Sequence, residues 1–144
     1  MFNSILVVCV GNICRSPTGE RLLRNLLPER KIDSAGISAL VGEPADARAA
    51  EVAEQYGLSL AGHKGQQITA SMCHEYDLIL VMEKKHIEAV CQLVPEVRGK
   101  VMLFGHWFNK CDITDPYRQS REAFEFVYRL LYESAQKWGG ALSR

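Results

Sequence analysis

Apolar residues gather in four short runs along the chain, and the stretches between them carry helical spacing. The first run, Ser4–Cys9, is β-branched and does not alternate with polar residues, as expected of a strand covered on both faces. The remaining runs predict strands at Lys31–Ala35, where Gly36 closes the run, within residues 76–83 and within residues 99–104.

Helical segments are predicted between these runs. Ser16 is expected to be the N-cap of a helix, with Pro17 in its first turn, and leucines with helical spacing follow before Pro28 ends the helix. Further helices are expected within residues 45–57, 69–75, 84–94 and 120–138. One face of the last helix carries Phe124, Val127, Leu131 and Ala135.

Strands that alternate with helices predict an α/β fold, a four-stranded parallel sheet with helices on both faces. We find no linker, repeat or low-complexity segment, so residues 1–144 are expected to form a single domain. Ligands of such sheets bind beyond the carboxyl ends of the strands. Cys9 lies at one such end and the loop after Phe104 at another.

Composition narrows the class of protein. The 17 basic and 17 acidic residues leave no net charge, which argues against a nucleic-acid binder that relies on a basic face. The apolar N-terminal residues lack a basic start and are interrupted at Gly11, so they predict neither a signal peptide nor a membrane span. Five cysteines, an odd number without the spacing of a disulfide scaffold, favour a reducing, cytoplasmic location.

The segment after the first strand carries the strongest chemical signal. Cys9 and Arg15 have the spacing C-x5-R, and Ser16 follows directly. A loop of this length before a helix N-terminus lets successive backbone N–H groups point inward and bind an anion. Gly11 and Asn12 tolerate the backbone angles of such a curl, and the planar arginine fork grips two phosphate oxygens. The residues expected to bind phosphate are Val10, Gly11, Asn12, Ile13, Cys14 and Ser16.

This cradle also suits a nucleophile. The inward N–H groups stabilise a thiolate, so Cys9 is expected to attack a cradled phosphate while Ser16 donates a hydrogen bond to the sulfur. Asn12 and Ser34 are expected to brace the cradle from behind. The alternative is structural: the bare spacing recurs by chance, with Cys9 a small buried residue and Arg15 an exposed residue at a helix start.

Two motifs near opposite ends of the chain, VCVGNICRSPTGE and DPYRQSRE, resemble those of the low-molecular-weight protein tyrosine phosphatases. The resemblance extends through DSAG, YDLILVME and GKVMLFGHW and covers essentially the whole chain. It implies a four-stranded parallel sheet, a cysteinyl-phosphate intermediate, and neither metal nor cofactor. The chain looks most like the bacterial branch partnered with tyrosine autokinases of exopolysaccharide export. The implied partner is a phosphotyrosine protein, a membrane tyrosine autokinase of polysaccharide or capsule production. Neither nucleic-acid binding nor membrane insertion is expected, and the enzyme is expected to be a monomer.

The second motif supplies the expected acid. Asp115 precedes Pro116 in the polar loop after the fourth run, and Asp-Pro alone is ordinary for a turn. In the family pattern the aspartate of this motif is the general acid, which protonates the leaving oxygen and later activates water. Tyr117 is expected to form an aromatic wall against the phosphotyrosine ring, the alternative being a partly buried loop residue. Ile13 and Leu40 are further candidate walls.

Other reactive side chains predict structure rather than chemistry. No C-x2-C or H-x3-H spacing of a metal site joins Cys73, His74, His106 and Cys111. His63 and His86 are expected at the surface or in packing, and Met82 in the core. Arg118 and Arg121 are expected to be solvated charges, with guidance of an acidic peptide as the alternative.

Two other functions fit parts of the pattern. Arsenate reduction on the same fold would use Cys9 but needs a relay of downstream thiols, and Cys73 and Cys91 are far apart in sequence. A phosphoprotein-binding module without activity would be expected to lack Cys9, Arg15 or Asp115, and all three are present.

The second thiol of the first motif, Cys14, is not required for phosphatase chemistry. The nucleophilic Cys9 is expected to be the first group oxidised by peroxide. We expect it then to form a disulfide with Cys14 that blocks activity and prevents irreversible oxidation. The alternative is that Cys14 only fills the base of the cradle.

Overall fold

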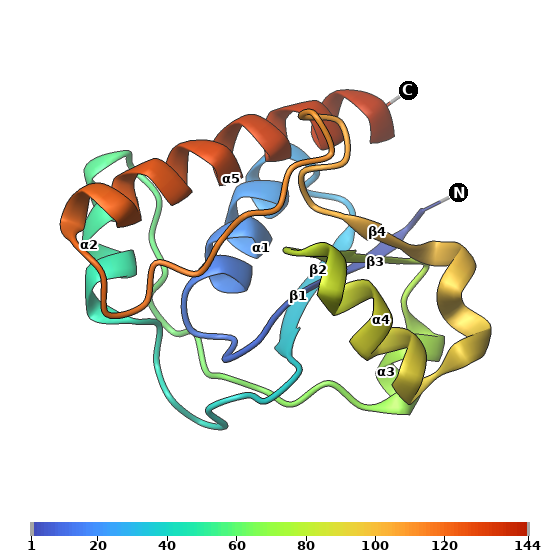
Figure 1. The fold of residues 1–144 in the computed structure, drawn as a ribbon. Coiled ribbons are helices and arrows are strands. Elements are labelled where there is room, and N and C mark those ends of the chain that lie inside the picture. The colour runs from blue at the N-terminus through green and yellow to red at the C-terminus, as the bar shows by residue number, and fades with distance from the viewer. Residues whose placement is uncertain (1, 144) are drawn as a thin grey trace.

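The computed structural model describes residues 2–143 as alternating strands and helices. β1 (Ser4–Cys9) leads into α1 (Arg15–Leu26), and β2 (Lys31–Gly36) leads into α2 (Ala47–Gln55) and α3 (Ala70–Glu75). β3 (Leu78–Val81) is followed by α4 (Lys84–Leu93), a 3₁₀ helix at Pro95–Lys100 (η1) and β4 (Val101–Leu103). The long helix α5 (Arg121–Leu142) packs along α1 (Figure 1).

All four strands form one parallel sheet in the order β2-β1-β3-β4. β1 is central: Cys9 lies opposite Gly36 of β2, and Val8 lies opposite Val81 of β3. Because the strands are parallel, their carboxyl ends meet at one edge, and the loops that follow Cys9 and Leu103 leave from the same side. The predicted α/β fold with a four-stranded parallel sheet is confirmed.

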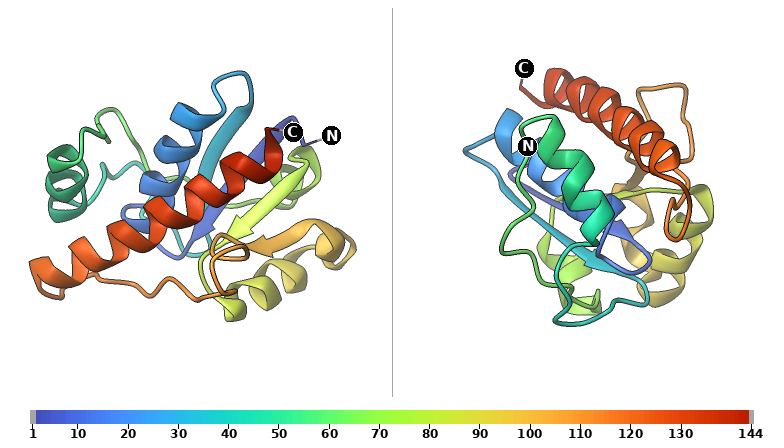
Figure 2. Two further views of the ribbon diagram at one scale, coloured as in Figure 1. Left: turned by 90° about the horizontal axis from the view of Figure 1, so that it is seen from above. Right: turned by 90° about the vertical axis from the view of Figure 1, so that its left-hand side faces the viewer.

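Side chains of β1 alternate between two buried layers. Ile5, Val7 and Cys9 belong to the core under α1 and α5, whereas Leu6 and Val8 belong to the core on the α3 and α4 side. Figure 2 shows α1 and α5 over one side of the sheet and α4 over the other, which confirms the helices on both faces. Burial on both sides explains why the sequence of β1 is apolar throughout.

The start of α1 differs from the prediction. Ser16 was expected to be the N-cap, but the helix begins at Arg15, and Cys14 stands at the N-cap position without a capping side chain. The Ser16 hydroxyl instead contacts Cys9 and Asn12, over 2.9 and 2.7 Å. Contacts with the preceding loop therefore override the local capping preference.

The end of the chain also differs. α5 continues to Leu142, four residues beyond the predicted end at Trp138. Gly139 does not end the helix because it packs against Leu26, where an added Cβ would lie 3.3 Å from the Leu26 Cδ1 atom. The third and fourth strands are shorter than their apolar segments, and Gly99 and Lys100 belong to η1.

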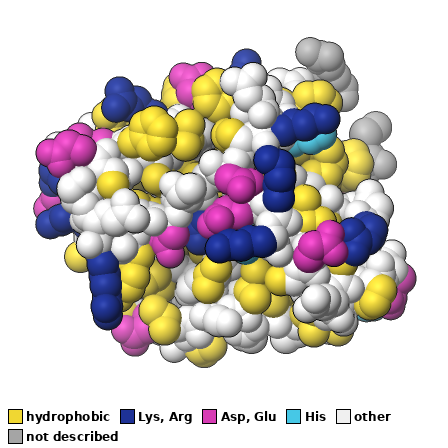
Figure 3. Space-filling model, in the orientation of Figure 1, with side chains coloured by type: hydrophobic (Ala, Val, Ile, Leu, Met, Phe, Trp, Pro, Cys, Tyr) yellow, Lys and Arg dark blue, Asp and Glu magenta, His cyan; other side chains and the backbone are white. Residues whose placement is uncertain are grey.

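The surface matches the neutral composition. On the face shown in Figure 3, basic and acidic side chains lie beside one another, with hydrophobic side chains scattered between them. Within residues 2–143, no helix combines the length and the apolar character needed to cross a bilayer.

Candidate active site

The loop between β1 and α1 is held from outside through its carbonyl groups. Each carbonyl oxygen of residues 9–13 accepts a hydrogen bond from a neighbouring segment, over distances of 2.5–3.0 Å. The donors are the backbone N–H groups of Ile37, Ser38, Leu40 and Asp46 and the Nε2 atom of His63. In a strand successive carbonyls point in opposite directions, and in a helix they all point along the axis. In this loop the carbonyls of residues 9–13 all point outward to the surrounding donors, and these hydrogen bonds hold the loop in its curl.

The other side of each peptide unit faces into the curl. A trans peptide is planar and its N–H points away from its C=O, and the described chain has no cis peptide bond. The N–H groups of residues 10–14 therefore point inward, and none of them donates to another group within residues 2–143. Asn12 adopts a φ of 59°, in the left-handed region that asparagine tolerates. With the N-terminus of α1, this arrangement can bind an anion.

Asn12 is the centre of a buried hydrogen-bond network behind the loop. Its Nδ2 donates to the hydroxyls of Ser16 at 2.7 Å and Ser34 at 3.0 Å, and its Oδ1 accepts from the Gln66 backbone N–H at 2.8 Å. The Ser34 hydroxyl donates in turn to Glu20, over 2.5 Å. The predicted bracing by Asn12 and Ser34 is confirmed.

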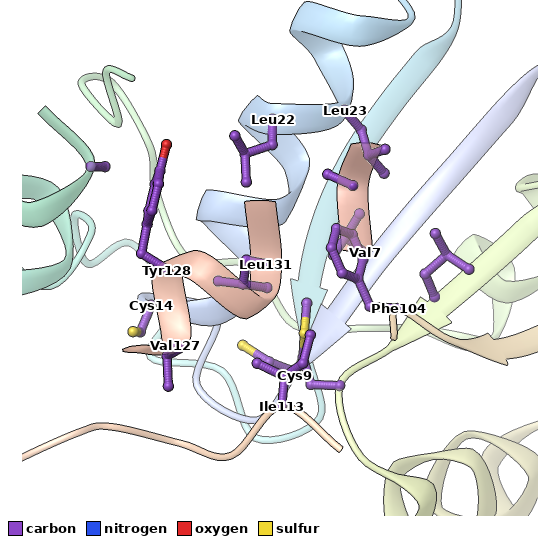
Figure 4. Close-up of a cluster of buried hydrophobic side chains, with 14 of the residues drawn as sticks. Val7, Cys9, Cys14, Leu22, Leu23, Phe104, Ile113, Val127, Tyr128 and Leu131 are labelled. Carbon is purple, nitrogen blue, oxygen red and sulfur yellow. The ribbon is translucent and has the colours of Figure 1, made fainter. Parts of the chain in front are cut away.

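Cys9 ends β1 beneath this loop. Its side chain is 2% exposed, and its Sγ lies 2.9 Å from the Ser16 Oγ. Figure 4 shows the Cys9 side chain at the end of the strand with Ile113 beside it. A thiolate at this position can accept the Ser16 hydroxyl hydrogen as well as interact with the inward N–H groups.

Arg15 is buried, with an exposed fraction of 2%, and three groups surround its guanidinium. Its Nη1 donates to Glu83 Oε2 at 2.6 Å and to the Ile113 carbonyl oxygen at 2.8 Å. Its Nη2 lies 3.8 Å from Asp115 Oδ2. The alternative in which Arg15 is an exposed residue at a helix start is therefore wrong.

Asp115 reaches the same place from the loop before α5. Its side chain is 46% exposed, and its Oδ1 accepts the Tyr117 backbone N–H at 3.0 Å. That bond spans two residues and is typical of an aspartate turn. Asp115 therefore forms the turn and also directs its second oxygen toward Arg15.

A small cavity of about 30 Å³ joins the two motifs. Its walls are Cys9, Gly11, Ile13, Cys14, Arg15, Asp115 and Tyr117. Of the other predicted residues, Val10 and Asn12 contribute inward N–H groups, and Ser16 contacts the sulfur. The Leu40 side chain is 46% exposed and does not line the cavity, although its backbone N–H supports the loop.

Several residues of the site were missed in the sequence. Glu83 pairs with Arg15 and directly follows the apolar run of β3, which lies next to β1, so the rule on strand ends could have found it. His63 was expected at the surface or in packing and is buried, but its hydrogen bond to the Asn12 carbonyl oxygen was not predicted. Gln66 reaches the same loop, and no sequence signal marks it or His63.

Two further buried groups lie beside the site. Burial raises the pKa of the Cys14 thiol well above its ordinary value. His86 accepts the Glu83 backbone N–H at Nδ1, and its buried Nε2 has no hydrogen-bond partner within residues 2–143. Burial, and then the nearby Arg15 charge, lower the pKa of His86.

Comparison with known proteins agrees with this geometry. A family model described as low molecular weight phosphotyrosine protein phosphatase matches residues 4–144. The chain is 65% identical over 144 residues to the probable low molecular weight protein-tyrosine-phosphatase AmsI of Erwinia amylovora, with 100% of each chain covered. It is 62% identical over 143 residues to the low molecular weight protein-tyrosine-phosphatase Wzb of Escherichia coli K12, covering 99% of this chain and 97% of that protein.

A solved structure gives the same result in three dimensions. Vibrio vulnificus Wzb in complex with benzylphosphonate superposes with a TM-score of 0.96 at 57% identity, covering 99% of this chain and 100% of that one. Fold, sequence and family pattern thus agree over almost the full length. The chain therefore belongs to the low molecular weight phosphotyrosine protein phosphatase family, and it is a phosphatase.

Proposed function

We propose that the protein hydrolyses phosphotyrosine in proteins through a cysteinyl-phosphate intermediate, with Cys9 as the nucleophile. The observation that supports this most is that Cys9, Arg15 and Asp115 line one small cavity at the end of β1. The inward N–H groups and the Ser16 hydroxyl surround the sulfur that would attack phosphorus.

In the first step the Cys9 sulfur attacks phosphorus in line, a sulfur–phosphorus bond forms, and the bond to the tyrosine oxygen breaks. The N–H groups of residues 10–14 stabilise the charge on the equatorial oxygens. Arg15 contributes the Nε and Nη2 donors, which make no hydrogen bond within residues 2–143, whereas Nη1 is held by Glu83 and Ile113. A planar fork fixed on one side can present its remaining donors to two oxygens.

Asp115 acts in both steps. As a neutral acid it donates its proton to the departing tyrosine oxygen. In the second step its carboxylate takes a proton from water, whose oxygen attacks phosphorus as the bond to sulfur breaks. Ser16 then donates to the released thiolate from 2.9 Å.

Selectivity for phosphotyrosine follows from the depth of Cys9 below the rim of the cavity. Cys9 is almost fully buried, so an aromatic ring is needed to bridge from the rim to the sulfur. Tyr117, which is 42% exposed, and Ile13 form the walls against that ring. Leu40 contacts substrate only beyond the cavity, at the outer rim.

The physiological substrate that we propose is a membrane tyrosine autokinase of exopolysaccharide or capsule production. The family resemblance and the similarity to proteins named Wzb and AmsI support this assignment. The enzyme would act in the cytoplasm, as a single-domain monomer on the phosphorylated cytoplasmic part of the kinase.

Matched phosphotyrosine and phosphoserine peptides test the reaction. We expect the wild type to hydrolyse the phosphotyrosine peptide far faster, and Cys9→Ser to lose turnover while still binding the peptide. Cys9→Ser also allows capture of the phosphorylated substrate from cells. Normal turnover by Cys9→Ser contradicts the mechanism, and equal rates on the two peptides contradict the depth argument.

Arg15→Lys tests the cradle separately. A lysine retains the charge but not the two-pronged contact, so kcat/KM should fall heavily. Wild-type kinetics in that variant would contradict the proposed role of the guanidinium.

A further inference from the structure

A groove of about 520 Å³ opens beside the catalytic cavity and shares Tyr117 with it. Its walls come from the start of α2, the loop before α5 and the first turn of α5. The lining residues are Asp46, Ala47, Arg48, Glu51, Tyr117, Arg118, Gln119 and Phe124. Because Tyr117 stands between the two spaces, a peptide with its phosphotyrosine in the cavity can place a neighbouring side chain in the groove.

Neither acidic residue of the groove forms an ion pair with Arg48 or Arg118 within residues 2–143. Asp46 caps α2, since its Oδ1 accepts the backbone N–H groups of Arg48 at 2.9 Å and Ala49 at 3.0 Å. Glu51 forms an ion pair with Arg121.

The two arginines of the groove are not compensated. Neither Arg48 nor Arg118 takes part in an ion pair within residues 2–143, and both are exposed. Arg48 Nη1 donates to the Gln119 carbonyl oxygen at 3.2 Å, and the Arg118 guanidinium carbon lies 5.3 Å from the centre of the Tyr117 ring. A carbonyl and an aromatic face orient a guanidinium without neutralising it.

Arg118 is held in an unusual backbone conformation. Its φ of 64° lies in the left-handed region, where a residue other than glycine, asparagine or aspartate is strained. Gln119 donates its backbone N–H to the Pro116 carbonyl oxygen at 2.8 Å, which closes this tight turn. The turn that follows Asp115 thus also places Arg118 in the wall of the groove.

We propose that the Arg48–Arg118 groove binds an acidic side chain that neighbours the phosphotyrosine of the substrate. This proposal rests on the proposed function, because it concerns the peptide on either side of the reacting residue. The Tyr117 ring would contact the phosphotyrosine on one side and support Arg118 on the other. Two exposed charge contacts correspond to about a three- to tenfold gain in kcat/KM, which falls as salt screens them.

The experiment uses a set of phosphotyrosine peptides in which one glutamate is moved through the three positions on each side, with glutamine elsewhere. We expect at least one position to raise kcat/KM of the wild-type protein by about three- to tenfold over the all-glutamine peptide. The gain should shrink at high salt and should be lost in the double variant Arg48→Gln, Arg118→Gln. The quantity compared is the glutamate-to-glutamine ratio within each protein, so small changes in overall activity cancel.

Arg129→Gln is the matched control. Arg129 is an exposed arginine of α5 that forms no ion pair within residues 2–143 and does not line the groove. This variant should keep both the activity and the glutamate preference. The proposal is overturned if no position of glutamate raises kcat/KM, or if the double variant keeps the preference. Wild-type turnover of the all-glutamine peptide separates these results from a failure of the proposed function, since that failure would abolish turnover of every peptide.

Discussion

Replacing Glu83 with glutamine tests whether its ion pair holds Arg15 in the position that phosphate binding requires. Glu83 Oε2 lies 2.6 Å from the Arg15 guanidinium, and the exposed fractions of the two side chains are 14% and 2%. Glutamine has nearly the same shape and still offers a carbonyl oxygen, so the substitution removes the charge more than the contact.

The expected cost follows from this burial. Two unit charges about 4 Å apart interact by about 4 kcal/mol at an effective dielectric constant of about 20. Removing one partner of a buried pair costs about 3–5 kcal/mol. Glutamine keeps one hydrogen bond and Asp115 remains 3.8 Å from the guanidinium, so we expect a loss of about 2–3 kcal/mol. For a domain of this size, that loss lowers the melting temperature by about 10 °C.

The assay is thermal unfolding with and without inorganic phosphate, together with kcat/KM on an aryl phosphate. Stabilisation by phosphate grows with its affinity, and a displaced guanidinium binds phosphate more weakly, so phosphate should stabilise the variant less than the wild type. Displacement of the guanidinium should lower kcat/KM by about 10- to 100-fold.

Glu88→Gln provides the matched control, since Glu88 lies on α4 and pairs with Arg98 at 3.1 Å, where both side chains are largely exposed. Exposed pairs contribute little, so that variant should melt close to the wild type. If Glu83→Gln has the same melting temperature as Glu88→Gln and retains full activity, Glu83 does not hold Arg15 in place.

Asp115→Asn should slow the hydrolysis of aryl phosphates with poor leaving groups by about 100-fold or more, and the hydrolysis of those with good leaving groups much less. Uniform slowing across the series would mean that Asp115 only forms the turn. Peroxide should join Cys9 to Cys14, detectable by mass spectrometry, and Cys14→Ala should recover less activity on reduction than the wild type; equal recovery contradicts the protective role. The pKa of His86 is lowered in the folded chain. As pH falls below about 6.5, His86 therefore binds a proton in the unfolded chain before it does so in the folded chain. The contribution of His86 to the free energy of unfolding should therefore be fully present above that pH and decline below it. His86→Asn, which keeps an acceptor, should weaken this decline. An unchanged pH profile would show that other groups cause it.

The residues of the site that could be predicted are those in the segments that follow a strand, because the order of strands and helices along the chain already places them. A buried run ending at Cys9 and a second run ending near Phe104 place their following loops at one edge of a parallel sheet, whatever the loops contain. The side chains of Arg15 and Asp115 could therefore be expected to meet before any contact was known. Glu83 follows from the same rule, because β3 is the neighbour of β1.

The supports of the cradle could not be predicted in this way. His63 and Gln66 lie in a segment between α2 and α3 without helical or alternating periodicity, and tertiary contacts alone bring it beneath Asn12. Ser16 shows the opposite problem, since a strong local signal for an N-cap was overridden by its contact with Cys9. Local propensity was least reliable where the backbone serves the cavity.

Glycines in these supporting segments explain how close the surrounding chain comes. A Cβ on Gly36 would clash with the Val10 carbonyl oxygen, and a Cβ on Gly65 would clash with the Leu40 carbonyl oxygen. Leu40 itself donates its backbone N–H to the Gly11 carbonyl oxygen. The segment at Gly36 therefore packs directly against the loop, and the segment at Gly65 packs against the residue that supports it. The C-x5-R motif supplies the proposed nucleophile and the arginine fork, but outside segments that lie within hydrogen-bond reach turn its carbonyls outward. The spacing also recurs by chance in chains that lack these neighbouring segments. It forms an anion site only where such neighbours fix the direction of every peptide in the loop.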